Sequence, residues 1–223
     1  MSFIKKFVGD KAFYKMTLTV AVPIMIQNFI TNFVSMLDNL MVGSLGTEQM
    51  SGVSIVNQLI FVFGLAVFGA LSGAGIFTAQ FYGKNDNDGI RYTLRYKLII
   101  SGILVVIALA VFSFFDDFLI RLYLHESDSA GNIELTLTFA KQYLRIMLWS
   151  ALPFCVTQIF SSTLRETGET VAPMVAGLIA VITNCTFNWV LIFGKLGFPA
   201  LGVEGAAIAT TISRYVECTI III

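Results

Sequence analysis

Charged residues are scarce in this chain, and their scarcity excludes most classes of soluble protein. Lys, Arg, Asp and Glu make up 13% of the 223 residues, against about 25% in an average soluble domain. Hydrophobic residues make up 57%, and the mean hydropathy is +0.83. The formal net charge is +0, so there is no basic excess to attract nucleic acid. The composition therefore predicts an integral membrane protein without a nucleic-acid partner.

Cysteine and histidine are also rare, which limits metal, disulfide and catalytic chemistry. Cys155, Cys185 and Cys218 lie singly in apolar segments, without the paired spacing of a metal site or a disulfide framework. His125 lies in an acidic stretch, where a solvated loop residue is expected. The sequence carries no phosphate-binding loop and no recognisable Ser/His/Asp set. We therefore expect neither an enzyme nor a resident cofactor.

Long apolar runs are what the chain has in abundance. A membrane-spanning helix needs roughly 20 mainly apolar residues, and six stretches meet this requirement: residues 16–41, 50–81, 94–115, 135–160, 171–193 and 201–223. These runs predict an all-α fold, a bundle of six transmembrane helices over residues 16–223. Residues 1–15 are expected to form a cytoplasmic amphipathic lead-in. The last run reaches Ile223 without a polar tail, so we expect the chain to be part of a longer protein.

The basic residues predict the orientation of the bundle in the membrane. Connections that face the cytoplasm carry an excess of Lys and Arg, and such residues occur before the first run, between the second and third, and between the fourth and fifth: Lys5, Lys6, Lys11, Lys15, Lys84, Arg91, Arg95, Lys97 and Arg165. The connection between the third and fourth runs is acidic. We therefore expect a multi-pass protein of the inner (plasma) membrane with a cytoplasmic N-terminus.

Four polar residues of the first run share one helical face, because they are separated by four, four and three positions: Gln27, Thr31, Ser35 and Asp38. An ionisable residue within a span is a functional-site hypothesis by default, because its burial in lipid costs at least ~2.5 to 3.5 kcal/mol. The stripe predicts a face that lines a water-accessible cavity, with Pro23 as the cause of a bend or hinge. The alternative is that Asp38 caps the helix at a wet interface while the amides join neighbouring helices.

The fifth and sixth runs supply further polar groups. Asn184 and Asn188 share a face at a spacing of four, and their carbonyl oxygens suit a small hard cation such as Na⁺. The alternative is that they bond to one another or to a neighbouring backbone. Thr210 adds a hydroxyl in the sixth run, where Arg214 and Glu217 are expected to form a local ion pair.

Several motifs, taken in chain order, resemble the N-terminal half of a prokaryotic multidrug and toxic compound extrusion (MATE) transporter. They begin with Pro23 and Gln27 before the run from Asp38 to Gly46 and continue through essentially the whole chain: Gln80-Phe81-Tyr82-Gly83, Tyr143-Leu144-Arg145-Ile146, Leu152-Pro153-Phe154, Leu164-Arg165-Glu166-Thr167-Gly168, Pro173 and Gly202-Val203-Glu204-Gly205-Ala206-Ala207. The resemblance implies a twelve-helix antiporter of two six-helix lobes, of which this chain is the first. It also implies export of drugs or organic cations, driven by Na⁺ or H⁺.

The resemblance further implies roles for individual residues. Asp38 matches the first-helix carboxylate of a cation site, Asn184 matches an amide of that site, and Thr210 matches its hydroxyl. The sequence departs from some members at Asn188, where they carry a second carboxylate, so the coupling ion stays open between Na⁺ and H⁺. Protonation of Asp38, or Na⁺ held by Asp38 with the Asn and Thr oxygens, is expected to change how the first helix packs near Pro23.

Two other functions compete with this interpretation. A flippase for a lipid-linked saccharide would need several basic residues for a pyrophosphate, whereas Arg214 is the one basic residue that the sequence places deep in a span. A non-transporting six-helix assembly protein would require that the protein stop near Ile223. The expected partners are thus a small-molecule drug or organic cation, the lipid bilayer and a C-terminal lobe of the same protein.

Overall fold

The described residues form helices joined by connections, with no strand among them, which confirms the all-α prediction. The computed structural model describes residues 10–124 and 132–223, apart from the side chains of Thr31 and Val34. Its helices follow one another in this order: α1 Lys11–Gly43, α2 Thr47–Gly83, α3 Asn87–Phe114, α4 Asp116–Tyr123, α5 Ile133–Met147, the 3₁₀ turn η2 Leu148–Ser150, α6 Ala151–Glu166, α7 Val171–Phe193 and α8 Gly202–Ile222. His125 and residues 1–9, which include Lys5 and Lys6, lie outside the described residues.

The six predicted spans are confirmed over the described residues. Six helical stretches are long and apolar enough to cross a membrane, namely α1, α2, α3, α7, α8 and the continuous stretch Ile133–Glu166 formed by α5, η2 and α6. Two of them are longer than predicted, since α1 has 33 residues and α2 has 37. A span requires roughly 20 residues, so both helices continue well beyond the apolar core of a bilayer.

The fourth span differs from the prediction of one uniform helix. It changes to the 3₁₀ turn η2 at Leu148–Ser150 before α6 resumes. Pro153 stands just after this turn and has no N–H to donate to the carbonyl four residues earlier. The Ser150 hydroxyl donates to the Met147 carbonyl at 2.6 Å and satisfies one group within the turn.

The helix α4 is a second element that the sequence reading missed. It lies in the acidic connection that we expected to be a loop, and its first turn carries Asp116 and Asp117. Asp117 accepts hydrogen bonds from Lys141 of α5 at 2.8 Å and from Arg121 at 2.8 Å. The hydrogen bond from Lys141, and to a lesser extent that from Arg121, holds the pKa of the Asp117 carboxyl below its usual range. The ion pairs therefore fasten α4 to the start of the fourth span.

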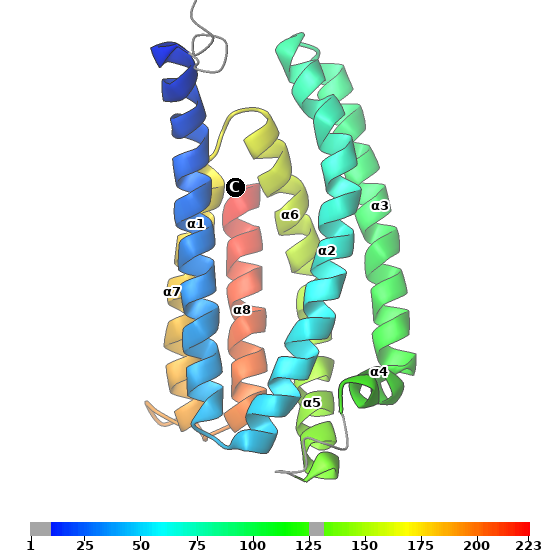
Figure 1. Cartoon of the computed structure of the whole chain (residues 1–223), viewed down its shortest axis with the longest axis vertical. Coiled ribbons are helices and arrows are strands. Elements are labelled where there is room, and N and C mark those ends of the chain that lie inside the picture. The colour runs from blue at the N-terminus through cyan, green and yellow to red at the C-terminus, as the bar shows by residue number, and fades with distance from the viewer. Residues whose placement is uncertain (1–9, 125–131) are drawn as a thin grey trace, which may run out of the picture.

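The helices form a bundle, and different connections lie at its two ends (Figure 1). The start of α1 and the α2–α3 and α6–α7 connections lie at the upper end in this view, and the α1–α2 and α7–α8 connections lie with α4 at the lower end. Helix α1 packs on α7 and α7 packs on α8, while α2 packs on α3, α5 and α6. Both α5 and α6 also contact α8, which therefore joins the two sides of the bundle.

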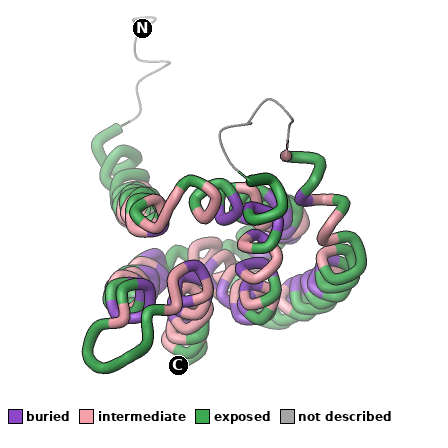
Figure 2. The backbone as a smooth tube through the Cα atoms, turned by 90° about the horizontal axis from the view of Figure 1, so that it is seen from below, coloured by how far each residue is buried: buried purple, intermediate pink, exposed green. Residues whose placement is uncertain are grey.

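Apolar side chains occupy both the contacts between helices and the outer surface. Figure 2 shows buried residues on the facing sides of the helices and exposed residues around the outside. Large side chains such as Phe29, Phe68 and Ile99 are more than 60% exposed. Lipid tails are as apolar as these side chains, so an apolar outer surface is expected of helices in a bilayer.

Two glycines allow the backbones of neighbouring helices to approach closely. A Cβ atom on Gly52 of α2 would lie 2.9 Å from the Thr136 carbonyl oxygen of α5, and one on Gly205 of α8 would lie 2.7 Å from the Leu191 carbonyl oxygen of α7. By contrast, Gly69 and Gly73 of α2 are four positions apart, a spacing typical of close helix packing, but a Cβ atom on either would have no atom of another described element within 4 Å. Spacing alone therefore does not reveal which helix face meets a neighbour.

Candidate functional site

Four polar side chains that the sequence reading selected meet between α1, α7 and α8. Asp38 of α1 lies beside Asn188 of α7, whose Nδ2 donates to Asp38 Oδ1 at 2.6 Å. The same Nδ2 contacts Asn184 Oδ1 at 3.1 Å, and Asn184 Nδ2 contacts Thr210 Oγ1 of α8 at 3.2 Å. We call Asp38, Asn184, Asn188 and Thr210 the Asp38 cluster. Helical periodicity explains the match with the prediction, because positions 184 and 188 necessarily share a face.

The amide of Asn184 has a polar environment in either of its two orientations. With its oxygen toward Asp38, that oxygen lies 3.0 Å from both carboxylate oxygens, an arrangement of three acceptors. With the amide turned over, Nδ2 donates to both Asp38 oxygens at 3.0 Å, and Oδ1 accepts from the Thr210 hydroxyl at 3.2 Å. The turned orientation suits an ionised carboxylate, since each acceptor then faces a donor. The first orientation needs a proton or a cation among the oxygens.

The cluster is largely shielded from solvent and contains one unused acceptor. Asn184 is 5% exposed and Asn188 is 1% exposed. The Asn188 Oδ1 atom is buried and has no hydrogen-bond partner among the described residues. Buried polar atoms are normally bonded, so each exception requires an explanation. The set of carboxylate, amide and hydroxyl oxygens is the chemistry that a small hard cation prefers.

A cavity of about 610 Å³ adjoins the Asp38 cluster and is lined by residues of α1, α2, α5, α6, α7 and α8. Asp38, Asn184, Asn188 and Thr210 all contribute to its wall, as does Ser35 of the predicted stripe. The charged lining residues among those described are Asp38, Arg214 and Glu217. The cavity thus combines an ionisable group with space for a small organic molecule.

The remaining residues of the predicted stripe are placed differently. Gln27 lies farther toward the upper end, where its Oε1 accepts from Arg165 at 2.6 Å and its Nε2 donates to the Pro173 carbonyl at 3.3 Å. The side chain of Thr31 is outside the described part of the chain. Helix α1 runs without a break through Pro23. Gln27 therefore joins α1 to the end of α6 and the start of α7.

Three residues of the cavity wall received no site role from the sequence alone: Tyr143, Arg214 and Glu217. Tyr143 of α5 is 4% exposed and lines the cavity, with its hydroxyl 3.4 Å from Asn57 Oδ1. It stands in one of the motifs that carry the resemblance, but an aromatic residue in an apolar run resembles any packing residue. The pair Arg214–Glu217 was predicted and is confirmed at 3.1 Å. Its position on the cavity wall was not predicted.

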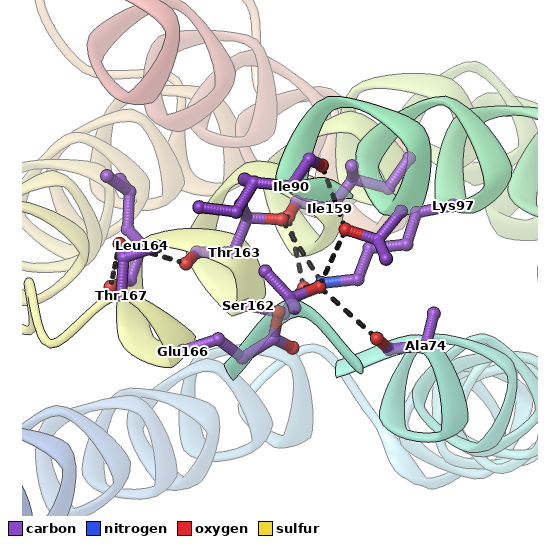
Figure 3. A network of polar contacts seen from close by, with 11 residues as sticks. Ala74, Ile90, Lys97, Ile159, Ser162, Thr163, Leu164, Glu166 and Thr167 are labelled. Carbon is purple, nitrogen blue, oxygen red and sulfur yellow. Dashed lines mark hydrogen bonds and ion pairs between the residues drawn. The ribbon is translucent and has the colours of Figure 1, made fainter. Parts of the chain in front are cut away.

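A second polar cluster lies between α2, α3 and α6 (Figure 3). Lys97 was assigned to the second-to-third connection, but it lies inside α3 with a fully buried side chain. Its Nζ contacts Glu166 Oε2 at 2.5 Å, Thr163 Oγ1 at 3.1 Å and Ser162 Oγ at 3.3 Å. The expectation that Arg214 is the one basic residue deep in a span was therefore wrong. Lys97 is not part of the cavity wall.

Comparison with known proteins agrees with this architecture. The sequence profile of the MatE family matches residues 23–190. A probable multidrug resistance protein NorM from Thermotoga maritima is 30% identical over 207 residues, which are 93% of this chain and 43% of that protein. The crystal structures of MATE in the bent and in the straight conformation superpose with TM-scores of 0.79 and 0.80 at 25% identity. Each match covers 93% of this chain and 44% of the chain in the solved structure.

The chain therefore spans less than half the length of the relatives that it matches. Its matches are transporters rather than enzymes, in agreement with the absence of a catalytic motif in the sequence. The profile match covers more than half of the chain, and the relatives, the structures and the six apolar helices point in the same direction. The chain belongs to the MatE family of multidrug and toxic compound extrusion transporters.

Proposed function

We propose that this chain forms the N-terminal lobe of a twelve-helix antiporter that exports drugs or toxic organic cations across the plasma membrane. Export is driven by inward movement of Na⁺ or H⁺, and Asp38 is the ion-coupling carboxylate. The other partners are the lipid bilayer and a C-terminal lobe of the same protein. The observation that carries this proposal is the contact of Asp38 with Asn188 at 2.6 Å on the wall of a 610 Å³ cavity.

Binding of the ion at the Asp38 cluster changes the hydrogen bonds between α1 and α7, and so the packing of these two helices. When Asp38 is ionised, the Asn184 amide turns its nitrogen toward the carboxylate. When Asp38 holds a proton or Na⁺, the amide turns its oxygen inward, and Asn188 Oδ1 becomes a further ligand. Because Asp38 belongs to α1 and the two amides to α7, the exchange changes how these helices attract one another.

Helix α1 is the element that carries this change to the rest of the lobe. Pro23 removes one backbone hydrogen bond from its ladder and is a site where the helix bends at low cost. The similar proteins have been solved in a bent and in a straight conformation, which supports two states of the lobe. An ion that binds one state better shifts the population toward it, and a drug that binds the other state better is then released.

The test replaces Asp38 by Asn in the full-length protein, reconstituted in vesicles with an imposed Na⁺ or H⁺ gradient. We expect drug exchange to be lost, because Asn has nearly the shape of Asp but cannot bind a proton or hold the charge of a cation. The readout is drug accumulation as a function of each gradient, which also identifies the coupling ion. Exchange at the wild-type rate would overturn the proposal.

Asp88→Asn is the matched control for this experiment. Asp88 undergoes the same chemical change, but its side chain is 78% exposed at the start of α3. Asp88 does not line the cavity. Its surface pair with Arg91 contributes little to stability. This variant should transport as the wild type does, and a loss equal to that of Asp38→Asn would show that the effect is not specific to the Asp38 cluster.

A further inference from the structure

Arg214 occupies an unusual position for a basic residue. It lies near the middle of α8, twelve residues after the helix begins at Gly202. At a rise of 1.5 Å per residue this places it about 18 Å along the helix. A charged side chain at such a depth is costly and is retained where it pairs with another group or faces a cavity. Arg214 does both, since it contacts Glu217 and lines the cavity.

The pair with Glu217 leaves much of the guanidinium available. Arg214 Nη1 donates one hydrogen bond to Glu217 Oε2 at 3.1 Å. A guanidinium carries five N–H donors, and a saturated Arg–carboxylate pair uses two parallel bonds. The Arg214 side chain is 35% exposed, whereas that of Glu217 is 11% exposed. The pair therefore presents its positive member to the cavity more than its negative one.

An aromatic surface holds the guanidinium in place. The Arg214 Cζ atom lies 5.3 Å from the centre of the Phe154 ring, and Phe154 is also part of the cavity wall. A cation over an aromatic face is attracted by the ring and keeps a fixed orientation. Phe61, Phe68 and Leu65 add apolar wall to the same cavity. The site thus combines an aromatic surface with a fixed fork of donors, the arrangement that binds a planar carboxylate.

The charges of the wall match a molecule that carries both signs. Asp38 and Glu217 are acidic and Arg214 is basic, so the described wall has two negative groups and one positive group when all are ionised. A simple organic cation would gain nothing from Arg214 and would be repelled by it. A substrate with a carboxylate as well as a cationic group would use both signs.

We propose that Arg214 is a specificity-determining residue of the cavity, which selects aromatic zwitterions that carry a carboxylate over monocations of the same shape. This inference rests on the proposed function, because it assigns the cavity to substrate binding. It narrows the substrate class from organic cations in general to compounds with a carboxylate that the Arg214 fork binds.

The experiment compares two fluorescent dyes that differ at one group. Rhodamine 110 carries a free carboxylate and is a zwitterion, and rhodamine 123 is its methyl ester and a monocation. Binding of each dye to the purified full-length protein is measured by fluorescence anisotropy. Rhodamine 110 should bind more tightly, and Arg214→Gln should weaken its binding about tenfold, the size expected for a lost charge-assisted hydrogen bond. Rhodamine 123 should change less than twofold.

Two further variants keep the test decisive if Arg214→Gln is poorly folded. Arg214→Lys keeps the charge but removes the planar fork, so it should lose part of the preference for the free acid. Glu217→Gln removes the competing carboxylate, so it should raise the preference. Arg95→Gln is the matched control, because Arg95 also stacks on an aromatic ring, that of Tyr92 at 5.8 Å, but is exposed on α3. It should leave both affinities unchanged.

The outcomes separate this inference from the proposed function. Equal affinity for the two dyes, no binding of the free acid, or an equal change for both dyes in the Arg214 variants would overturn the role of Arg214. A shift of the acid-to-ester ratio supports it, because a residue with a purely structural role would weaken both dyes alike. If this ratio shifts but Asp38→Asn still exchanges drug at the wild-type rate, the coupling proposal fails while the specificity of the cavity stands.

Discussion

At the residue scale, two polar clusters among the described residues differ in composition and in how fully their hydrogen bonds are satisfied. The Asp38 cluster has one carboxylate among amides and a hydroxyl, and it keeps a buried acceptor without a partner on Asn188. The Lys97 cluster pairs a buried cation with Glu166 and adds the hydroxyls of the neighbouring turn of α6. The Asp38 cluster thus has an acceptor that a bound ion could use, whereas the buried Lys97 ammonium already has three oxygen partners. We therefore expect the Lys97 cluster to stabilise the helix bundle.

Lys97→Met tests that expectation. The substitution keeps an unbranched apolar chain in the buried space but leaves Glu166 without its cation. Removal of one partner of a buried pair typically destabilises by about 3–5 kcal/mol. The double variant Lys97→Met/Glu166→Gln should recover much of this loss, because no unpaired charge remains. The measurement is the unfolding midpoint of the full-length protein in detergent.

Arg91→Met is the comparison for the Lys97 variants. Arg91 pairs with Asp88 at 3.2 Å, but both side chains are more than 70% exposed. Exposed pairs contribute little, so the midpoint should not move measurably. A Lys97→Met midpoint equal to that of Arg91→Met would show that the buried pair has no special role in stability.

Helical spacing explains which of these residues were predictable. Asn184 and Asn188 were expected on one face because they are four positions apart, and Arg214 was expected beside Glu217 because they are three apart. Lys97 and Glu166 are 69 positions apart, and no local rule joins them. A count of basic residues by connection treats every Lys alike, so Lys97 was assigned to a loop.

At the element scale, hydropathy was sufficient to find the spans but not their interruptions or contacts. The six spans follow from the length of the apolar runs. The 3₁₀ turn η2 and the short helix α4 do not, because the first is a local change of hydrogen bonding and the second has too few residues for a span. Gly52 and Gly69 both lie in α2 and look alike in sequence, although one is in close contact and the other is not.

Substitution of these two glycines by alanine should have opposite effects on stability. At Gly52 the added methyl lies 2.9 Å from the backbone oxygen of Thr136, and backbone cannot move aside cheaply. Overpacking of this kind costs typically about 1–3 kcal/mol. At Gly69 nothing described lies within 4 Å, and alanine is the better helix former by up to about 1 kcal/mol.

Thermal unfolding of the two variants in the same detergent measures the difference. Gly52→Ala should lower the midpoint, and Gly69→Ala should leave it unchanged or raise it. A lower midpoint for Gly69→Ala would indicate that this face of α2 packs against a part of the protein outside the described residues. Equal midpoints for both variants would contradict the close α2–α5 contact.

At the scale of the whole molecule, the two ends of the bundle differ in their basic residues. This difference is the basis for the expected orientation of the bundle in the membrane. Lys11, Lys15, Lys84 and Arg165 lie at or toward the upper end, where α1 begins and the α2–α3 and α6–α7 connections lie. The lower end has Lys195 in the α7–α8 connection and the ion-paired Arg121 and Lys141 beside α4. Because basic residues are retained on the cytoplasmic side, the upper end is expected to face the cytoplasm.

Single cysteines at the two ends test this orientation in cells. In full-length protein from which every native cysteine has been removed, Cys155, Cys185 and Cys218 among them, Lys84→Cys and Lys195→Cys each place one thiol in an exposed connection at opposite ends of the bundle. A membrane-impermeant maleimide should label Lys195→Cys in intact cells, and Lys84→Cys after the membrane is permeabilised. The two variants make the same chemical change, so thiol reactivity alone does not distinguish them. The reverse pattern would place the start of α1 outside the cell and would contradict the orientation expected from the basic residues.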